Sequence, residues 1–390
     1  MSQDRLLDTF LQLAVIPSPP RRERAAADFI AARLAGLGFH VEEDDAGCAL
    51  GGDAGNLRLR LPKRGRGGHA LVLCAHLDTV ETGERPIKPI VEGDWVRSDG
   101  DAILGADDKA GVAVLIELLQ RIKESRDAHG ELLFLFTVGE EIGCSGAAVL
   151  DADAYRGFDA GIVVDFPGAD ELVVAAPTKV SLRLEAQGRG GHAAWPERTL
   201  NAAHILCQVL AQLPQGRLDE HTTANLGILR AGSAVNIIPE RAGAEYEIRG
   251  HRRELLDFHL KHILGVVESG FRAARIPPSF PDASGPAAEP AVNSLVDVEV
   301  EVDYEGYRLA DDAPAARIAW EAMVKAGLAP RKVVTHGGSD ANIFNARGLP
   351  STVIGCGYLT PHSVHERLHI PDMHRALETL WHACTAERPQ

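Results

Sequence analysis

Short, almost wholly apolar segments that alternate with helix-like segments restrict the fold of this chain more than any other feature. LVLCAHLDTV, ELLFLFTVGEE and AGIVVDF are apolar until their last residues. Apolar residues at helical spacing mark RRERAAADFIAARLAG before the first of these segments and GVAVLIELLQRIKE after it. Strands that are apolar on both faces need helices on both faces, so we predict an α/β fold with a parallel or mixed sheet.

The pattern changes near residue 178, which predicts a second domain. TKVSLRLEAQG alternates between apolar and polar residues, as expected of a strand with one exposed face. From there to Tyr304 the expected elements follow the order βαββαβ, which is a ferredoxin-like arrangement. Beyond this point the first pattern returns. We therefore expect an α/β domain of residues 1–177 and 305–390, interrupted by a smaller α+β domain of residues 178–304.

Composition argues against several classes of protein. The net charge is −15, from 40 basic and 55 acidic residues, and the chain has no long basic run, so nucleic acid is not an expected partner. No apolar run approaches the roughly 18 residues of a membrane span, and the N-terminal segment lacks the features of a signal peptide. The six cysteines form no CxxC pair, which predicts reduced thiols and a cytoplasmic location.

Carboxylates and imidazoles gather where the expected strands end. Ligands of α/β sheets bind at the carboxyl ends of the strands, so these side chains should meet in one cleft. So many carboxylates would repel one another unless cations neutralise them. Imidazoles and carboxylates without thiolates suit zinc, manganese or cobalt. The residues are His76, Asp78, Asp107, Glu140, Glu141, Asp165, His362 and His365.

Each of these residues also has a simpler explanation when it is taken alone. Asp107 and Asp108 precede an apolar helix pattern, and an aspartate is a common N-cap there. A single His76 is more often a buried histidine than a ligand, and Asp165 could be a turn residue. The metal site is favoured because all of them stand at strand ends of the same sheet.

Seven segments together resemble a family of two-metal exopeptidases. This family includes peptidase T, carboxypeptidase G and the acetylornithine and succinyl-diaminopimelate deacylases, and the resemblance is greatest to the peptidase T-like branch. It extends from IPSPPRRE near the N-terminus to the last helix. It implies a zinc-exopeptidase-like α/β/α catalytic domain with an inserted lid and dimerisation domain. The segments are AHLDTV, GADDKAG, TVGEEIGCSGA, GRGGHAAWPE, NIIPE, GGSDAN and PHSVHE.

The resemblance implies two divalent metal ions per chain, zinc first and manganese or cobalt as alternatives. His76 and Asp165 would bind one of them, and Asp78 would orient the imidazole of His76 from behind. Asp107 would bridge both ions. The peptide bond between Asp107 and Asp108 would be cis.

The second ion would be bound by Glu141 and His362. We choose His362 over His365 because the ligand of the family stands four residues before a glutamate, and PHSVHE places His362 four residues before Glu366. Glu140 would be the general base.

The inserted domain would supply the remaining residues. His192 would stabilise the oxyanion, reaching in from a partner subunit of a homodimer, and Asn236 and Arg249 would hold the substrate. The sequence departs from the family in Phe166-Pro167 after Asp165, where small residues are commoner. The role of His336, next to GGSDAN, does not follow from the resemblance, and neither does that of His365.

The resulting prediction is metal-dependent hydrolysis of amide bonds in short peptides by a tripeptide aminopeptidase-like enzyme. A deacylase or carboxypeptidase that acts on N-acyl amino acids is the alternative within enzymes. A non-catalytic dimeric scaffold, or a small-molecule binding protein with a structural metal, is the alternative from another class. The sequence does not set the preferred side chains and length of the substrate, or the physiological metal.

Overall fold

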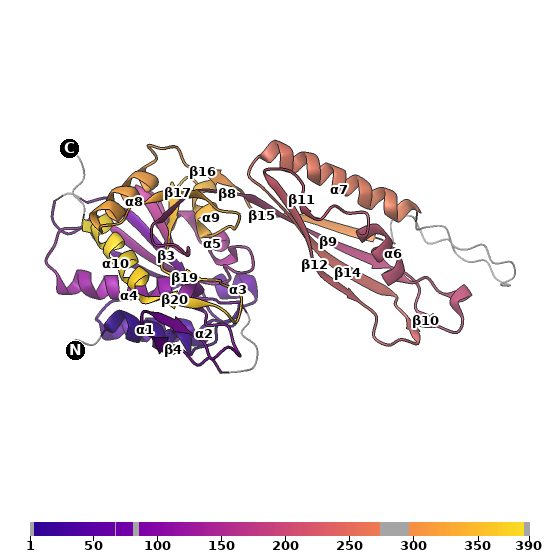
Figure 1. Ribbon diagram of the computed structural model, residues 1–390, viewed down its shortest axis with the longest axis horizontal. Coiled ribbons are helices and arrows are strands. Elements are labelled where there is room, and N and C mark those ends of the chain that lie inside the picture. The colour runs from indigo at the N-terminus through magenta and orange to yellow at the C-terminus, as the bar shows by residue number, and fades with distance from the viewer. Residues whose placement is uncertain (1–3, 67, 81–85, 274–295, 386–390) are drawn as a thin grey trace. The chain divides into compact units, whose positions relative to one another are not determined.

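Two units, each with a hydrophobic core of its own, make up the computed structural model, which describes residues 4–66, 68–80, 86–273 and 296–385 (Figure 1). Unit 1 consists of Met1–Ala176 and Tyr307–Gln390, and unit 2 of Pro177–Gly306. The chain therefore leaves unit 1 once and returns to it once.

The sheet of unit 1 explains the apolar segments of the sequence. All residues of β3, β6, β7 and β18 are buried, because these central strands have neighbours on both sides and helices on both faces. Strands β6, β3, β7 and β18 run parallel to one another. In order across the sheet, the strands are β1 (Glu42–Glu43), β2 (Leu57–Leu61), β6 (Leu132–Thr137), β3 (Leu71–His76), β7 (Ala160–Val164), β18 (Ser351–Ile354), β8 (Glu171–Ala176) and β16 (Tyr307–Arg308), with β17 (Arg331–Val334) beside β8.

Helix α4 is the central helix of unit 1. It packs on β3 and on the neighbouring helices α1 and α10, and it is buried over most of its length. Leu71 and Leu73 of β3 join the same core cluster, whereas Val72 on the opposite face is just as deeply buried. The helices are α1 (Arg5–Ala14), α2 (Arg24–Gly36), α3 (Ala46–Leu50), α4 (Ala106–Glu124), α5 (Ser145–Val149), α8 (Pro314–Lys325), α9 (Asp340–Ala346) and α10 (Ile370–Thr385).

A second, small sheet of unit 1 carries part of the candidate site. Its strands are antiparallel and only two or three residues long. They tie the segment 358–369 to the segment 90–97. In order, they are β19 (Tyr358–Leu359), β20 (Arg367–His369), β5 (Trp95–Arg97) and β4 (Ile90–Glu92).

Unit 2 has one antiparallel sheet with helices α6 (Ala202–Leu210) and α7 (Arg253–Ala273) on one face. Buried and less buried residues alternate along β9 and β14, as the sequence pattern predicts. The order of the four long strands is that of a ferredoxin-like fold. In order, the strands are β11 (Gly216–Arg217), β12 (Thr222–Ala231), β14 (Arg241–Gly250), β9 (Thr178–Gln187) and β15 (Val296–Tyr304).

Two further features concern the chain as a whole. Ala176 at the end of β8 pairs with Tyr307 at the start of β16, so the chain leaves and re-enters unit 1 at neighbouring strands. No helix among the described residues is both long and apolar enough to cross a membrane.

Candidate metal centre

The carboxyl ends of neighbouring parallel strands bring the predicted polar residues of unit 1 together. His76 is the last residue of β3, Asp165 follows β7, and Glu141 lies just beyond β6. Asp107 enters from the side, at the start of α4. Two groups of possible ligands result, His76–Asp107–Asp165 and Asp107–Glu141–His362, and within each group the ligand atoms lie within 4.8 Å of one another.

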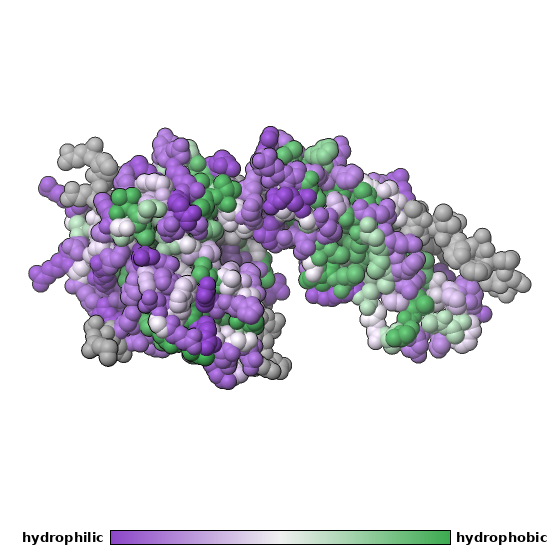
Figure 2. Space-filling view, in the orientation of Figure 1, coloured by the Kyte–Doolittle hydropathy of each residue, from purple (hydrophilic) through white to green (hydrophobic). Residues whose placement is uncertain are grey.

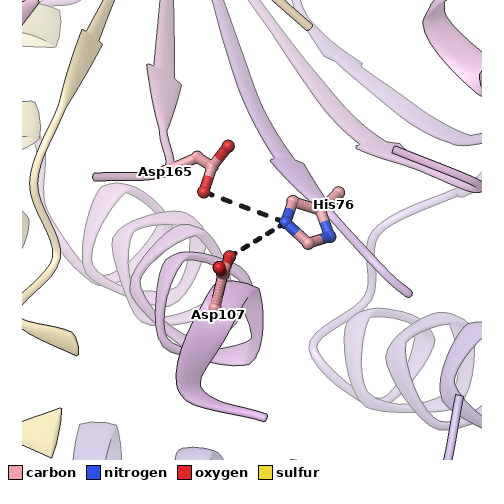
Figure 3. A group of neighbouring side chains, drawn as sticks. All are labelled: His76, Asp107 and Asp165. Atoms are coloured by element: carbon pink, nitrogen blue, oxygen red, sulfur yellow. Dashed lines mark hydrogen bonds and ion pairs between the residues drawn. The ribbon is translucent and has the colours of Figure 1, made fainter. Parts of the chain in front are cut away.

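The first group is shown in Figure 3. His76 Nε2 lies 3.2 Å from Asp107 Oδ1 and 3.8 Å from Asp165 Oδ1. The other ring nitrogen, Nδ1, is 2.8 Å from the main-chain oxygen of Asp78, which fixes the ring with Nε2 toward the two carboxylates. Both His76 and Asp165 are nearly or fully buried, so water competes little for these atoms.

Asp78 contacts both the imidazole of His76 and the backbone of the loop after β6. Its carboxylate lies 3.5 Å from His76 Nδ1, but its two oxygens accept the backbone N–H groups of Glu140 and Glu141, each at 3.0 Å. Asp78 therefore connects the end of β3 to the loop after β6.

The second group shares Asp107 with the first. His362 Nε2 lies 3.4 Å from Asp107 Oδ2 and 3.0 Å from Glu141 Oε1. Asp107 thus turns one oxygen toward each group, as a bridging carboxylate does. His365 is exposed and His336 is exposed, and neither belongs to a group of possible ligands among the described residues.

The charges of the two groups call for a cation. Burial acts to raise the pKa of Asp107, but the imidazoles of His362 and His76 outweigh it and hold that pKa well below its usual range. The carboxylates of Asp107 and Glu141 in turn raise the pKa of His362 to about 10. Burial, and then the charge of Asp107, raises the pKa of Asp165 well above its usual range. The positive charge of the imidazoles thus balances part of the negative charge of the carboxylates. A divalent metal ion bound by the same side chains would balance more of it.

One orphaned atom also fits a metal ion. Glu141 Oε1 is buried and forms an ion pair with His362 Nε2 at 3.0 Å, but the pair lacks the geometry of a hydrogen bond. A cation shared with His362 would satisfy this oxygen. Nitrogen and oxygen donors without sulfur suit a divalent ion such as zinc, manganese or cobalt.

Glu140, like Asp78, is a carboxylate of the site that belongs to neither group. Burial, together with the neighbouring charges of Glu141, Asp340 and Asp78, raises the pKa of Glu140 well above its usual range. The thiol of Cys144 donates to Glu140 Oε1 at 3.4 Å. A carboxyl group with a raised pKa beside a metal site is suited to acid–base chemistry.

The loop that carries Asp107 is held by residues far away in sequence. Glu366 accepts the backbone N–H groups of Gly105 (2.6 Å) and Asp107 (3.0 Å). Asp108 accepts the N–H of His76 at 3.1 Å, and Lys109 donates to the main-chain oxygen of Ile16. The peptide bond between Asp107 and Asp108 is cis, which confirms the expectation from the resemblance.

Two of the supporting residues were missed by the sequence interpretation. The hydroxyl of Tyr358 donates to Asp165 Oδ1 at 3.0 Å. Glu23 accepts the N–H of Gly139 at 3.2 Å, directly before the loop of Glu140 and Glu141. Glu23 stands in the segment IPSPPRRE, where no alternation of apolar and polar residues indicates that its side chain is buried. Tyr358 could not be assigned because its partner, Asp165, is 193 residues away in the sequence.

The three remaining predicted residues lie in unit 2, which is described here by itself. A two-stranded ribbon is formed by β10 (Gly191–His192) and β13 (Ile237–Ile238), and it carries His192 and, directly before β13, Asn236. The N–H of Ala193 donates to the main-chain oxygen of Asn236 at 3.0 Å. Arg249 is in β14, and its guanidinium donates two hydrogen bonds to Glu247, at 2.9 and 3.0 Å.

The ribbon also exposes apolar side chains. Figure 2 shows apolar surface at this end of unit 2. The ring of His192 contacts that of Trp195 at 5.2 Å between centroids. The large apolar side chains that are most exposed near the ribbon are Trp195, Val235 and Ile237.

Comparison with known proteins gives a consistent result. The family described as Peptidase family M20/M25/M40 matches residues 72–386. The crystal structure of a tripeptidase from Staphylococcus aureus subsp. aureus Mu50 is 32% identical over 98% of this chain and 97% of that chain, with a TM-score of 0.81. The crystal structure of aminopeptidase PepT from Bacillus cereus ATCC 10987 is 30% identical over 99% of this chain and 98% of that chain, with a TM-score of 0.77. Uncharacterized protein YqjE from Bacillus subtilis (strain 168) is 33% identical over 380 residues, 97% of each chain. The predicted fold class is confirmed by this likeness.

Proposed function

This chain belongs to peptidase family M20/M25/M40, and from that premise we propose that it is a metal-dependent aminopeptidase of short peptides, tripeptides among them. The observation that carries the proposal is the pair of ligand groups that share Asp107, with the carboxyl group of Glu140 beside them and in neither group. The similarity to an aminopeptidase and to a tripeptidase at 30% identity or more supports the substrate class.

Two divalent ions would be held by the two groups of unit 1. His76 and Asp165 would bind the first, Glu141 and His362 the second, and Asp107 would bridge them. Zinc is the proposed ion, because its usual ligands in enzymes are imidazole nitrogens and carboxylate oxygens, and manganese or cobalt would suit the same donors.

Glu140 is the proposed general base. When bound, the two ions would supply a Lewis acid for the scissile carbonyl and a water of lowered pKa. Glu140 accepts the proton of the attacking water at its carboxylate and passes it to the leaving amine. Asp78 holds Glu140 in place through its backbone N–H and keeps the ring of His76 oriented.

Unit 2 is the proposed lid and dimerisation domain. His192 would donate a hydrogen bond to the oxyanion of the tetrahedral intermediate, from a partner subunit of a homodimer. Asn236 would hold the substrate beside it. Arg249 would bind a substrate carboxylate. Its guanidinium would then contact both that carboxylate and Glu247. The free cysteines of the described residues support a cytoplasmic location.

Activity on a free tripeptide tests the proposal. Protein stripped with a chelator is titrated with Zn²⁺, Mn²⁺ or Co²⁺, and cleavage of Leu-Gly-Gly and of its N-acetylated form is followed at each step. We expect activity to rise to a maximum at about two ions per chain and to be confined to the free amine.

Other outcomes would contradict the proposal in different ways. Activity on the acetylated peptide alone would keep the metal centre and assign the chain to the deacylases of N-acyl amino acids. Two bound ions with no activity on either peptide would favour a non-catalytic scaffold. A chain that binds no ion would remove the metal centre itself.

A further inference from the structure

Tyr358 touches a candidate metal ligand without being one. Its hydroxyl donates to Asp165 Oδ1 at 3.0 Å, the same oxygen that lies 3.8 Å from His76 Nε2. Tyr358 is 4% exposed, so water cannot replace it as a donor.

Backbone hydrogen bonds between the segment before Tyr358 and the segment after Asp165 place this hydroxyl beside Asp165. The N–H of Cys356 donates to the oxygen of Phe166 at 2.8 Å, and the N–H of Gly357 donates to the oxygen of Pro167 at 3.0 Å. The two segments approach so closely that a Cβ on Gly355 would overlap the backbone of Gly168. The segment before Tyr358 is therefore bonded to the segment directly after Asp165.

The same stretch of chain also reaches the second ligand group. Residues 358, 362 and 366 are four residues apart, and each contacts a different part of the centre. Tyr358 bonds to Asp165, His362 lies beside Asp107 and Glu141, and Glu366 accepts the N–H of Asp107. A short piece of chain that begins in β19 and ends before β20 thus contacts both groups.

We infer that Tyr358 is a positioning residue for the first metal group. Its hydroxyl holds the carboxylate of Asp165 in the orientation that faces His76, and in this way it sets the affinity of that group for its ion. The inference rests on the proposed metal centre and assigns to it a residue outside the two ligand groups.

The physical reason is the freedom of an aspartate side chain. Without a donor, the carboxylate can turn about its last torsion, whose preferences are broad, and both oxygens become equivalent. A hydrogen bond to Oδ1 removes this freedom before the ion arrives. Partners of this kind typically change metal affinity or activity about 10- to 100-fold when they are removed.

Tyr358→Phe tests the inference, because it removes one hydroxyl and keeps the ring. Chelator-stripped full-length protein is titrated with Co²⁺ in competition with a coloured chelator, and two binding constants are fitted. We expect one constant to weaken about tenfold or more and the other to stay within about twofold. Activity measured at saturating Co²⁺ should then recover most of its wild-type value.

Tyr246→Phe is the matched control. Tyr246 is a tyrosine of unit 2 that is 1% exposed and whose hydroxyl donates to the main-chain oxygen of Pro214. Its loss should lower the melting temperature and leave both Co²⁺ constants unchanged. An equal change of both constants in the two variants would mean that Tyr358 acts through general stability, and the inference would be wrong.

A double-mutant cycle with Asp165→Ala, which removes the acceptor of the hydrogen bond, provides the second measurement. If Tyr358 acts through Asp165, then Tyr358→Phe has no further effect on Co²⁺ binding in the Asp165→Ala protein. Independent losses in the two variants would overturn the inference, and so would unchanged constants in Tyr358→Phe. Wild-type protein that binds no Co²⁺ would instead contradict the proposed function.

Discussion

At the scale of single residues, Asp107 shows how one side chain serves two groups of ligands. Its Oδ1 faces His76 at 3.2 Å and its Oδ2 faces His362 at 3.4 Å. Its own N–H is held by Glu366, which is buried and accepts a second N–H from Gly105. The position of the shared carboxylate is thus fixed by its backbone, so that both oxygens are left for ligand binding.

Glu140→Gln should separate binding from chemistry. The amide keeps the size of the side chain but cannot accept the proton of the attacking water, so we expect kcat to fall about 10²- to 10⁴-fold. The stoichiometry of bound metal should remain that of the wild type, since Glu140 is in neither ligand group.

Peptide hydrolysis and bound metal measured on the same preparation check this expectation. Glu321→Gln is a suitable control, because Glu321 is an exposed residue of α8. Near-normal turnover in Glu140→Gln would exclude Glu140 as the base.

Glu23 should make the stability of the chelator-stripped protein depend on pH. Burial raises the pKa of Glu23 to about 7 from its ordinary value of 4.5, and its Oε2 is buried without a partner. The unfolded chain therefore ionises first as the pH rises. The contribution of the protonated group is full below about pH 4.5, is lost progressively up to about pH 7, and is constant above.

Glu23→Gln should remove this part of the pH dependence. A shift of 2.5 units (7 minus 4.5) corresponds to at most about 3 kcal/mol in the free energy of unfolding. Urea unfolding of wild type and variant between pH 4.5 and 7.5 measures it. Identical slopes in both proteins would show that Glu23 does not titrate in this range.

Residues of the site differ in how far the sequence could predict them. His76, Asp107, Glu141, Asp165 and His362 stand at strand ends or in a spaced motif, and the structure brings them together in two groups. Tyr358 and Glu23 could not be predicted in the same way, because their partners lie in distant segments and a single polar residue has no period.

At the scale of elements, two helix glycines should respond to alanine in opposite directions. A Cβ on Gly111 in α4 would overlap the oxygen of Val164 and the carboxylate of Asp108, whereas a Cβ on Gly265 in α7 would meet nothing within 4 Å. Alanine is favoured over glycine in a helix by about 0.5–1 kcal/mol. Gly265→Ala should therefore stabilise the protein by about that amount.

Gly111→Ala should instead destabilise it, by about 1–3 kcal/mol, since the packing leaves no room for the methyl group. It should also weaken metal binding, because Asp108 follows Asp107 directly. Thermal unfolding of both variants, with metal titration of the first, tests the pair. A stabilised Gly111→Ala protein would mean that α4 can move away from β7 without harm.

The elements themselves were predicted unequally. The long apolar strands and α4 follow from residue patterns, because burial on both faces leaves a continuous apolar run. The small sheet of β4, β5, β19 and β20 has strands of two or three residues. Two or three residues are too few to show the alternation of apolar and polar side chains that marks a strand. These strands are formed by tertiary contacts and could not be predicted from the local sequence.

At the scale of the whole molecule, metal removal should affect one unit more than the other. Both ligand groups belong to unit 1, and each unit has its own core. We expect two unfolding transitions in calorimetry. Free metal at 100 times its dissociation constant stabilises the folded state by about 2.7 kcal/mol per ion, so a chelator should lower the transition of unit 1.

Variants assign the transitions. Tyr246→Phe should lower the melting temperature of unit 2 alone, which identifies its transition. A chelator that lowers both transitions equally, or neither, would contradict the placement of the ions in unit 1.

The position of β18 has a consequence for synthesis. This strand, residues 351–354, lies between β7 and β8, whereas every strand of unit 2 comes from residues 177–306. On the ribosome, unit 2 can therefore fold while the sheet of unit 1 still has a gap at its centre. A nascent chain that has passed residue 306 but not yet reached 354 holds two apolar strand edges open. Chains of that length are the ones that a chaperone would need to protect.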